Sequence, residues 1–204
     1  MTTPATRSRQ NTRARLLEAA AQVFAEIGLE GATVEAVCER AGFTRGAFYS
    51  NFESLDELFL MLANSVGEAR VTTVRERIGA MDDNAIAECD PVDLVQQIMD
   101  SGQDDRLDVL LMSEIRIRAL RDPVFGAAYL AGEREMVASI AQIIRDIVET
   151  GQITLRIDPE EAARLLMVVW EGMVVRGAMG GDDSEDLRRA GSTALGRMVE
   201  LMKV

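Results

Sequence analysis

The spacing of apolar residues constrains this chain more than any other feature of its sequence. From Thr12 onward, apolar residues such as Leu16, Ala20 and Val23 recur at intervals of three and four. This is the period of an amphipathic helix, whereas a strand alternates every second residue. No strand-like alternation persists anywhere, so the sequence predicts an all-α fold of about nine helices.

Residues that favour helix ends indicate where these helices begin and stop. Three Asp-Pro pairs predict helix starts, because Asp can accept a hydrogen bond from a free backbone N–H and Pro has none to leave unpaired. These pairs are Asp90-Pro91, Asp122-Pro123 and Asp158-Pro159. Ser54 and Glu57 have the spacing of a capping box at the start of a long helix, which we expect to end near Gly79. Gly28 and Gly151 are expected to end two other helices.

Composition argues against an enzyme. The chain has no histidine, and its two cysteines belong to no paired-ligand spacing, so the commonest general base and a zinc site are missing. We therefore expect no enzymatic activity, no metal site and no cofactor, although a site made of carboxylates alone stays open. No apolar run approaches the ~18 residues of a membrane span, and no secretory signal is evident, so we expect a cytoplasmic protein without a membrane partner.

Charge is distributed unevenly along the chain. The net charge is −12, yet the first 52 residues carry six arginines against five glutamates, a net +1, which leaves −13 for the remainder. We interpret residues 1–10 as a mobile basic arm. An acidic protein can still bind a polyanion through one basic region, provided that the acidic bulk faces away.

Residues 33–52 have the layout of a helix-turn-helix. The turn Ala41-Gly42-Phe43 supplies a small residue for the helix crossing, a glycine that tolerates positive φ, and an apolar plug. Phe48 and Phe52, four residues apart, would form the buried face of the second helix. The opposite face would then be offered to the major groove of DNA.

Six residues are candidates for DNA binding. They are Thr33, Thr44, Arg45, Gly46, Tyr49 and Asn51. Arg45 could meet phosphate or guanine from the first turn of the second helix, and Tyr49 lies one turn later on the same face. Each candidate also has a purely structural alternative, such as an N-cap for the two threonines or half-buried packing for the tyrosine. Gly46 costs about 1 kcal/mol inside a helix, which a close approach of the DNA backbone would justify.

This segment resembles the TetR/AcrR family of transcriptional regulators. The resemblance rests on GATVEAVCERAGF at residues 31–43 and TRGAFYSNFESLDEL at residues 44–58, and the specific match covers residues 12–60. It implies a repressor that binds a palindromic double-stranded DNA operator as a homodimer and is released by a small-molecule effector of unknown identity. Two positions depart from the family pattern: Leu55 stands where a phosphate-binding Lys is usual, and Asn51 replaces a frequent His.

The last two predicted helices are candidates for the dimer interface. Residues 159–179 are apolar nearly all round, and residues 185–202 carry an apolar stripe. Two such helices from each chain could form a four-helix bundle, with Val168 and Leu195 at the interface of residues 159–202. The glycines that would allow close approach are Gly172, Gly191 and Gly196. An ordinary internal core is the alternative.

A ligand pocket is expected where apolar helical faces converge. The segments concerned are residues 58–70, 107–118, 136–148 and 166–176. The candidate ligand-binding residues are Leu62, Leu111, Glu114, Arg118, Ile140, Ile144, Trp170 and Met173. Glu114 could instead form a structural pair with Arg118, one turn later. Glu114 and Glu171 would disfavour an anionic effector, so an apolar or cationic one is expected.

These patterns predict three parts: the basic arm at residues 1–10, a three-helix helix-turn-helix DNA-binding domain at residues 11–53, and a C-terminal helical ligand-binding and dimerisation domain at residues 54–204. The competing interpretation is an all-α protein-interaction module that binds neither DNA nor a ligand. Only residues 33–52 discriminate between the two, because an interaction module needs no Arg-Gly-x-x-Tyr surface behind a helix-turn-helix turn.

Overall fold

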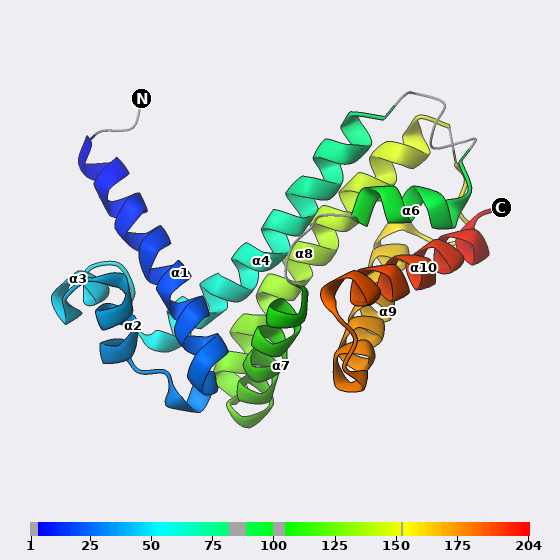
Figure 1. Ribbon diagram of the computed structural model, residues 1–204. Helices are drawn as coiled ribbons and strands as arrows, with labels where there is room; N and C mark the ends of the chain where they lie inside the picture. The colour runs from blue at the N-terminus through cyan, green and yellow to red at the C-terminus, as the bar shows by residue number, and fades with distance from the viewer. Residues whose placement is uncertain (1–3, 82–88, 100–104, 152) are drawn as a thin grey trace. The chain divides into compact units, whose positions relative to one another are not determined.

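The computed structural model describes residues 4–81, 89–99, 105–151 and 153–204. Within these ranges the chain forms nine helices, and the predicted all-α fold is confirmed (Figure 1). The helices are α1 (Pro4–Gly31), α2 (Val34–Ala41), α3 (Arg45–Tyr49), α4 (Leu55–Gly79), α6 (Pro91–Met99), α7 (Asp105–Arg121), α8 (Pro123–Glu149), α9 (Pro159–Gly180) and α10 (Ser184–Met202).

The predicted helix starts are confirmed at all three Asp-Pro pairs. Asp90, Asp122 and Asp158 each accept a hydrogen bond from the backbone N–H two residues later, at 2.8–2.9 Å. At the start of α4, Ser54 accepts from the Glu57 N–H at 3.1 Å, as a capping box requires. Glu57 reaches back to the N–H of Glu53 and not to that of Ser54, so the reciprocal bond is displaced by one residue.

The N-terminal segment differs from its prediction. We expected an arm over residues 1–10 and a helix from Thr12, whereas α1 already begins at Pro4; residues 1–3 lie outside the described ranges. At the other end, Gly28 has φ 71° and ψ 177° and interrupts the regular helix where its end was predicted. Polar helices are hard to find from apolar periodicity, because their first turns have no buried face.

The chain separates into two compact units. The first unit comprises residues 1–66 and 110–130, and the second comprises residues 67–109 and 131–204. The first unit therefore contains the helix-turn-helix, the first half of α4 and the junction of α7 and α8. The division into a DNA-binding domain and a ligand-binding domain at residue 53 stays a prediction. Helices α4, α7 and α8 each contribute to both units.

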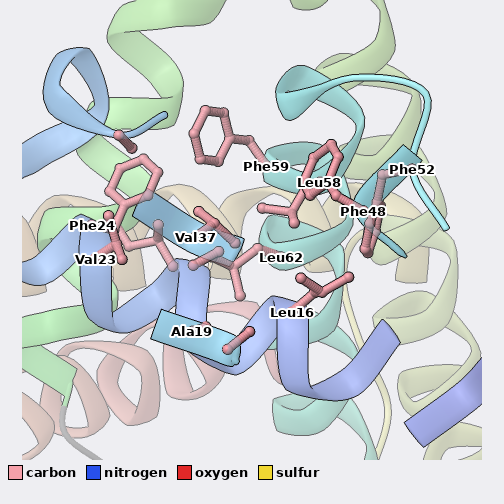
Figure 2. Packing of buried hydrophobic residues seen from close by; sticks show 14 of the residues in the cluster. Leu16, Ala19, Val23, Phe24, Val37, Phe48, Phe52, Leu58, Phe59 and Leu62 are labelled. Atoms are coloured by element: carbon pink, nitrogen blue, oxygen red, sulfur yellow. The ribbon is translucent and has the colours of Figure 1, made fainter. Parts of the chain in front are cut away.

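The core of the first unit is built around aromatic residues (Figure 2). Phe48 and Phe52 of the predicted recognition segment are 0% and 1% exposed, as expected from their spacing. Phe24 of α1 meets Phe59 of α4 edge to face, with ring centroids 4.7 Å apart. Leu58 is fully buried beside them. The helix-turn-helix is thus fixed to α4 through a shared apolar core.

The second unit owes its close packing to two glycines of α10. A Cβ on Gly191 would lie 2.6 Å from the Trp170 ring of α9, and a Cβ on Gly196 would lie 2.4 Å from Cα of Val92 in α6. These glycines therefore permit contacts within one chain, where we had expected them to serve contacts between two chains. Leu195 is likewise buried, at 8% exposed.

Within the described ranges, no helix combines the length and the apolarity that crossing a bilayer requires.

Candidate nucleic-acid interface

The turn between α2 and α3 has the geometry that a helix-turn-helix needs. Gly42 adopts the left-handed conformation, φ 71° and ψ 34°, and its N–H closes the end of α2. The chain then reverses, and the Phe43 N–H donates to the Cys38 carbonyl at 2.9 Å. Phe43 itself is partly buried against the core of the first unit. A residue with a Cβ would be strained at position 42, so the turn depends on its glycine.

Thr33 and Thr44 cap the two helices of the motif. The Thr33 hydroxyl accepts from the Ala36 N–H at 3.1 Å, and the Thr44 hydroxyl accepts from the Ala47 N–H at 3.2 Å. A hydroxyl that accepts one hydrogen bond still has its own hydrogen to donate. Both threonines are exposed, so capping leaves each of them able to donate to a phosphate oxygen.

Arg45 and Tyr49 share one exposed face of α3, as their spacing predicted. The Arg45 side chain is 62% exposed and forms an ion pair of 2.7 Å with Glu35 of α2. Its guanidinium carbon lies 5.9 Å from the centre of the Tyr49 ring. The Tyr49 hydroxyl and the Glu35 carboxylate raise the pKa of Arg45 above its ordinary value, because both interactions favour the charged guanidinium.

Gly46 is not required by the packing of the chain itself. A Cβ there would meet its nearest neighbour, the Thr44 hydroxyl oxygen, at 3.7 Å, which is ordinary van der Waals contact. Position 46 is exposed and has no positive φ. Its lack of a side chain therefore leaves open space only on the outer surface of α3.

Asn51 does not lie where we expected it. The residue is 7% exposed, and its amide nitrogen donates to the Ala47 carbonyl at 2.8 Å and to the Ser50 hydroxyl at 3.2 Å. Its side chain therefore ties the end of α3 to the preceding turn and does not project from the exposed face. Leu55, the first residue of α4, packs against the core of the first unit.

Arginines of α1 donate hydrogen bonds to backbone carbonyls of the helix-turn-helix. The sequence interpretation missed this role. Arg9 donates to the Ser50 carbonyl at 3.0 Å, and Arg13 donates to the Asn51 carbonyl at 2.8 Å. Arg13 also lies over the Phe52 ring, 4.6 Å from its centre, and pairs with Glu57 at 3.4 Å. Arg15 donates to the Ala41 carbonyl at 2.9 Å. The spacing of Arg9 and Arg13, one helical turn, was the available signal.

Comparison with known proteins identifies the group to which this architecture belongs. The family model described as "Bacterial regulatory proteins, tetR family" matches residues 16–62. The model described as "BetI-type transcriptional repressor, C-terminal" matches residues 92–200, more than half of the chain. The chain belongs to the TetR family. It is therefore a helix-turn-helix transcriptional regulator, and the matched family and relatives are regulators rather than enzymes.

Individual relatives agree with this assignment over nearly their whole length. The HTH-type transcriptional regulator UidR of Escherichia coli K12 is 27% identical over 188 residues, covering 92% of this chain and 89% of UidR. The HTH-type transcriptional repressor AcnR of Corynebacterium glutamicum is 29% identical over 170 residues, covering 83% and 84%. The solved structure of Salmonella enterica GusR has the same fold, with a TM-score of 0.71, 24% identity, and coverage of 99% and 98%.

The predicted ligand-binding residues of this TetR-family chain fall into both compact units. In the first unit, Leu62 and Leu111 are buried core residues, 6% and 5% exposed. Arg118 pairs with Asp56 at 2.8 Å and with Asp122 at 3.7 Å, so the expected pair with Glu114 is wrong. Glu114 is only partly buried. Asp56 lies in the first turn of α4, so Arg118 of α7 pairs with a carboxylate of another helix.

The second unit contains the remaining candidates, among them Trp170, the single tryptophan of the chain. Ile140 and Ile144 pack against a small buried cluster of α8 and α9, and Met173 is partly buried one turn after Trp170. The Trp170 indole N–H is buried and has no acceptor. The guanidinium of Arg70 lies 5.6 Å from the ring centre and pairs with Asp108 at 3.0 Å. Trp170 thus carries an unused donor beside a charged pair.

Helix α9 keeps an apolar stripe on its surface. Leu165, Val168 and Met179 are 40%, 67% and 82% exposed, and Gly172 and Val175 fill the intervening positions at intervals of three and four. These five residues, the α9 stripe, lie on one side of the helix.

Among the described residues, there is no group of three or more His, Cys, Asp or Glu side chains that is arranged to hold a metal ion.

Proposed function

We propose that this regulator represses transcription by holding a palindromic operator as a homodimer and that a small molecule bound in the second unit releases the DNA. The observation that carries the proposal is the helix-turn-helix, whose α3 presents Arg45 and Tyr49 outward while Phe48 anchors it inward. Such a regulator acts in the compartment that contains the DNA, which we take to be the cytoplasm.

The proposed DNA contacts use five of the six candidate residues. Arg45 reads a base edge or binds phosphate, and Tyr49 donates to phosphate. Thr33 and Thr44 donate their hydroxyl hydrogens to phosphate, and Gly46 lets the DNA backbone approach α3. Asn51 acts indirectly, because its amide holds the end of α3 in place.

The proposed dimer uses the α9 stripe. Exposed Leu165, Val168 and Met179 would leave contiguous apolar surface in water unless a second copy covers it. A symmetric pair of α9 helices, flanked by α10, would bury the stripe against itself. The two recognition helices would then lie about one DNA turn apart, roughly 34–36 Å, when the operator is bound.

The proposed effector contacts the neighbourhood of Trp170 and Met173. We expect an apolar or cationic compound that also carries a hydrogen-bond acceptor, because the Trp170 N–H is buried without one. Release requires that the effector bind the DNA-incompetent state more tightly; about 100-fold discrimination, or about 2.7 kcal/mol, is within the usual range of coupling. Helix α4 supplies residues to both units and would transmit the change.

The DNA proposal is tested by selecting bound duplexes from a random pool and measuring the affinity of the recovered sequence. We expect a palindrome, and Arg45→Ala should weaken binding by about 1–3 kcal/mol. Arg189→Ala is the matched control, since Arg189 is 61% exposed and also pairs with a glutamate. Failure to recover any sequence, or equal losses in the two variants, would overturn the proposal.

The effector proposal is tested through the fluorescence of Trp170, the single tryptophan. Compounds that release the preformed operator complex should shift this emission, and Trp170→Phe should keep operator binding while losing the response to the compound. A releasing compound that leaves the emission unchanged would place the effector elsewhere.

A further inference from the structure

The ion pair between Glu35 and Arg45 connects the two helices of the DNA-reading motif. Glu35 is the second residue of α2 and Arg45 is the first residue of α3. Their side chains are 58% and 62% exposed, and Glu35 Oε1 lies 2.7 Å from Nη1 of Arg45. The pair therefore occupies the exposed surface that the proposed DNA contacts share, and a carboxylate lies beside the cation that would meet DNA.

Ion pairs elsewhere in the first unit are placed differently. Arg13 pairs with Glu57 beneath the end of α3, and Arg40 pairs with Glu26 of α1. Neither pair includes a residue of α3. Arg45 is the single arginine of α3, and in the free protein Glu35 offsets its charge. Any DNA group that binds Nη1 of Arg45 must therefore compete with Glu35.

The interference from Glu35 depends on which DNA group Arg45 meets. A phosphate accepts two hydrogen bonds from the guanidinium fork, but its negative charge repels the Glu35 carboxylate beside it. A guanine in the major groove offers two uncharged acceptors, O6 and N7, to the same fork, and uncharged acceptors do not force the carboxylate away. Glu35 should therefore weaken sequence-independent binding more than binding to the operator.

We propose that Glu35 is a specificity-determining residue, which holds Arg45 in the absence of the correct base and so suppresses binding to non-operator DNA. This inference rests on the proposed function. An exposed ion pair contributes at most about 1 kcal/mol, which is about fivefold in an equilibrium constant for each recognition helix. Glu35 is thus expected to adjust discrimination and not to abolish binding.

The test compares Glu35→Gln with the unmodified protein on two duplexes: the operator recovered by selection, and a duplex of the same length and composition with scrambled sequence. Glu35→Gln should bind the scrambled duplex up to about fivefold more tightly per recognition helix. Operator affinity should change by less than about twofold, so the ratio of the two affinities falls. The salt dependence on the scrambled duplex should steepen by about one unit of slope per recognition helix.

Two further variants separate this role from a general effect of charge or of fold. Glu39→Gln removes the same charge from the same helix while leaving Arg45 paired with Glu35, and it should leave the ratio closer to that of the unmodified protein. In an Arg45→Ala background, Glu35→Gln should shift scrambled-duplex affinity no more than Glu39→Gln does. Glu35→Gln should unfold in one thermal transition, shifted by no more than the loss of one exposed ion pair allows.

The outcomes distinguish the two proposals. If the unmodified protein binds the operator and Glu35→Gln leaves the affinity ratio and the salt slope unchanged, this inference is overturned while the DNA-binding proposal stands. If Glu35→Gln lowers operator affinity, and this loss depends on the identity of a single operator base pair, then Glu35 reads a base directly. That result also overturns the inference. If the unmodified protein binds neither duplex, the proposed function itself fails and this inference fails with it.

Discussion

The helix-turn-helix and helix α9 present their surfaces in opposite ways. Around α3, the large apolar side chains Phe48 and Phe52 point inward, and the exposed face carries charged and hydroxyl groups already held by caps and an ion pair. On α9, apolar Val168 and Met179 lie in solvent. The polar groups of the first face already have partners within the single chain, whereas the second face exposes apolar side chains that another apolar surface would cover.

The comparison is tested most strongly at Phe48, the inward anchor of α3. Phe48→Ala should lower the free energy of unfolding by about 3–5 kcal/mol, because it removes a fully buried ring from a packed core. Its neighbour Tyr49 is 52% exposed, so Tyr49→Ala should cost about 1 kcal/mol or less. Urea unfolding at one protein concentration measures both. Equal losses would mean that the inward and outward sides of α3 are assigned incorrectly.

The α9 stripe is tested by adding a charge at Val168. Val168→Asp should weaken dimerisation by at least about 100-fold, or about 2.7 kcal/mol, because each interface would bury unpaired carboxylates. Val124→Asp is the control, since Val124 is 82% exposed but belongs to the first unit. Sedimentation equilibrium should find a monomer only for the α9 variant. Leu195→Asp does not test the interface, because Leu195 is buried within the chain.

Gly196 of α10 is expected to be needed for packing within a single chain. Gly196→Ala should destabilise the protein by about 1–3 kcal/mol, because its Cβ would meet the α6 backbone at 2.4 Å. In Gly180→Ala the nearest atom would be 3.8 Å from the new Cβ, and we expect no loss. Thermal unfolding distinguishes the two. If Gly196→Ala leaves the free energy of unfolding unchanged, Gly196 is not needed for packing within the chain, and a role between chains would be favoured.

The smallest effect is expected at Gly46. Gly46→Ala should raise the free energy of unfolding by about 0.5–1 kcal/mol, since alanine favours a helix and its Cβ meets no obstacle. If DNA approaches α3 closely, the same variant should bind the operator less tightly despite its greater stability. Unchanged operator affinity would reduce Gly46 to a position without a role in binding.

Local rules in the sequence were sufficient for most helix boundaries and for the helix-turn-helix, but not for the start of α1. The Asp-Pro starts, the Gly42 turn and the inward Phe48 and Phe52 each depend on residues within about four positions, and each is observed. Contacts between distant segments were not predictable in this way. Arg118 pairs with Asp56 on another helix, and no local pattern indicates that choice over Glu114.

The site was predicted less completely than the fold, and for a local reason. Spacing identified Arg45 and Tyr49 as exposed, but it also placed Asn51 on that face. The end of α3 comes at Tyr49, so the chain has left the helix before Asn51 and its side chain turns inward. A five-residue helix is too short for a periodic argument to hold across its end.

Helix α4 has a consequence for genetics. Its first half contributes Phe59 to the core that it shares with the helix-turn-helix, and its second half contributes Arg70 to the unit that contains Trp170. Screens for constitutive expression and screens for loss of inducibility should therefore recover substitutions in one uninterrupted helix. Constitutive alleles should cluster before Val66 and uninducible alleles after Gly67, so a map of allele position along α4 would locate the transition between the two phenotypes.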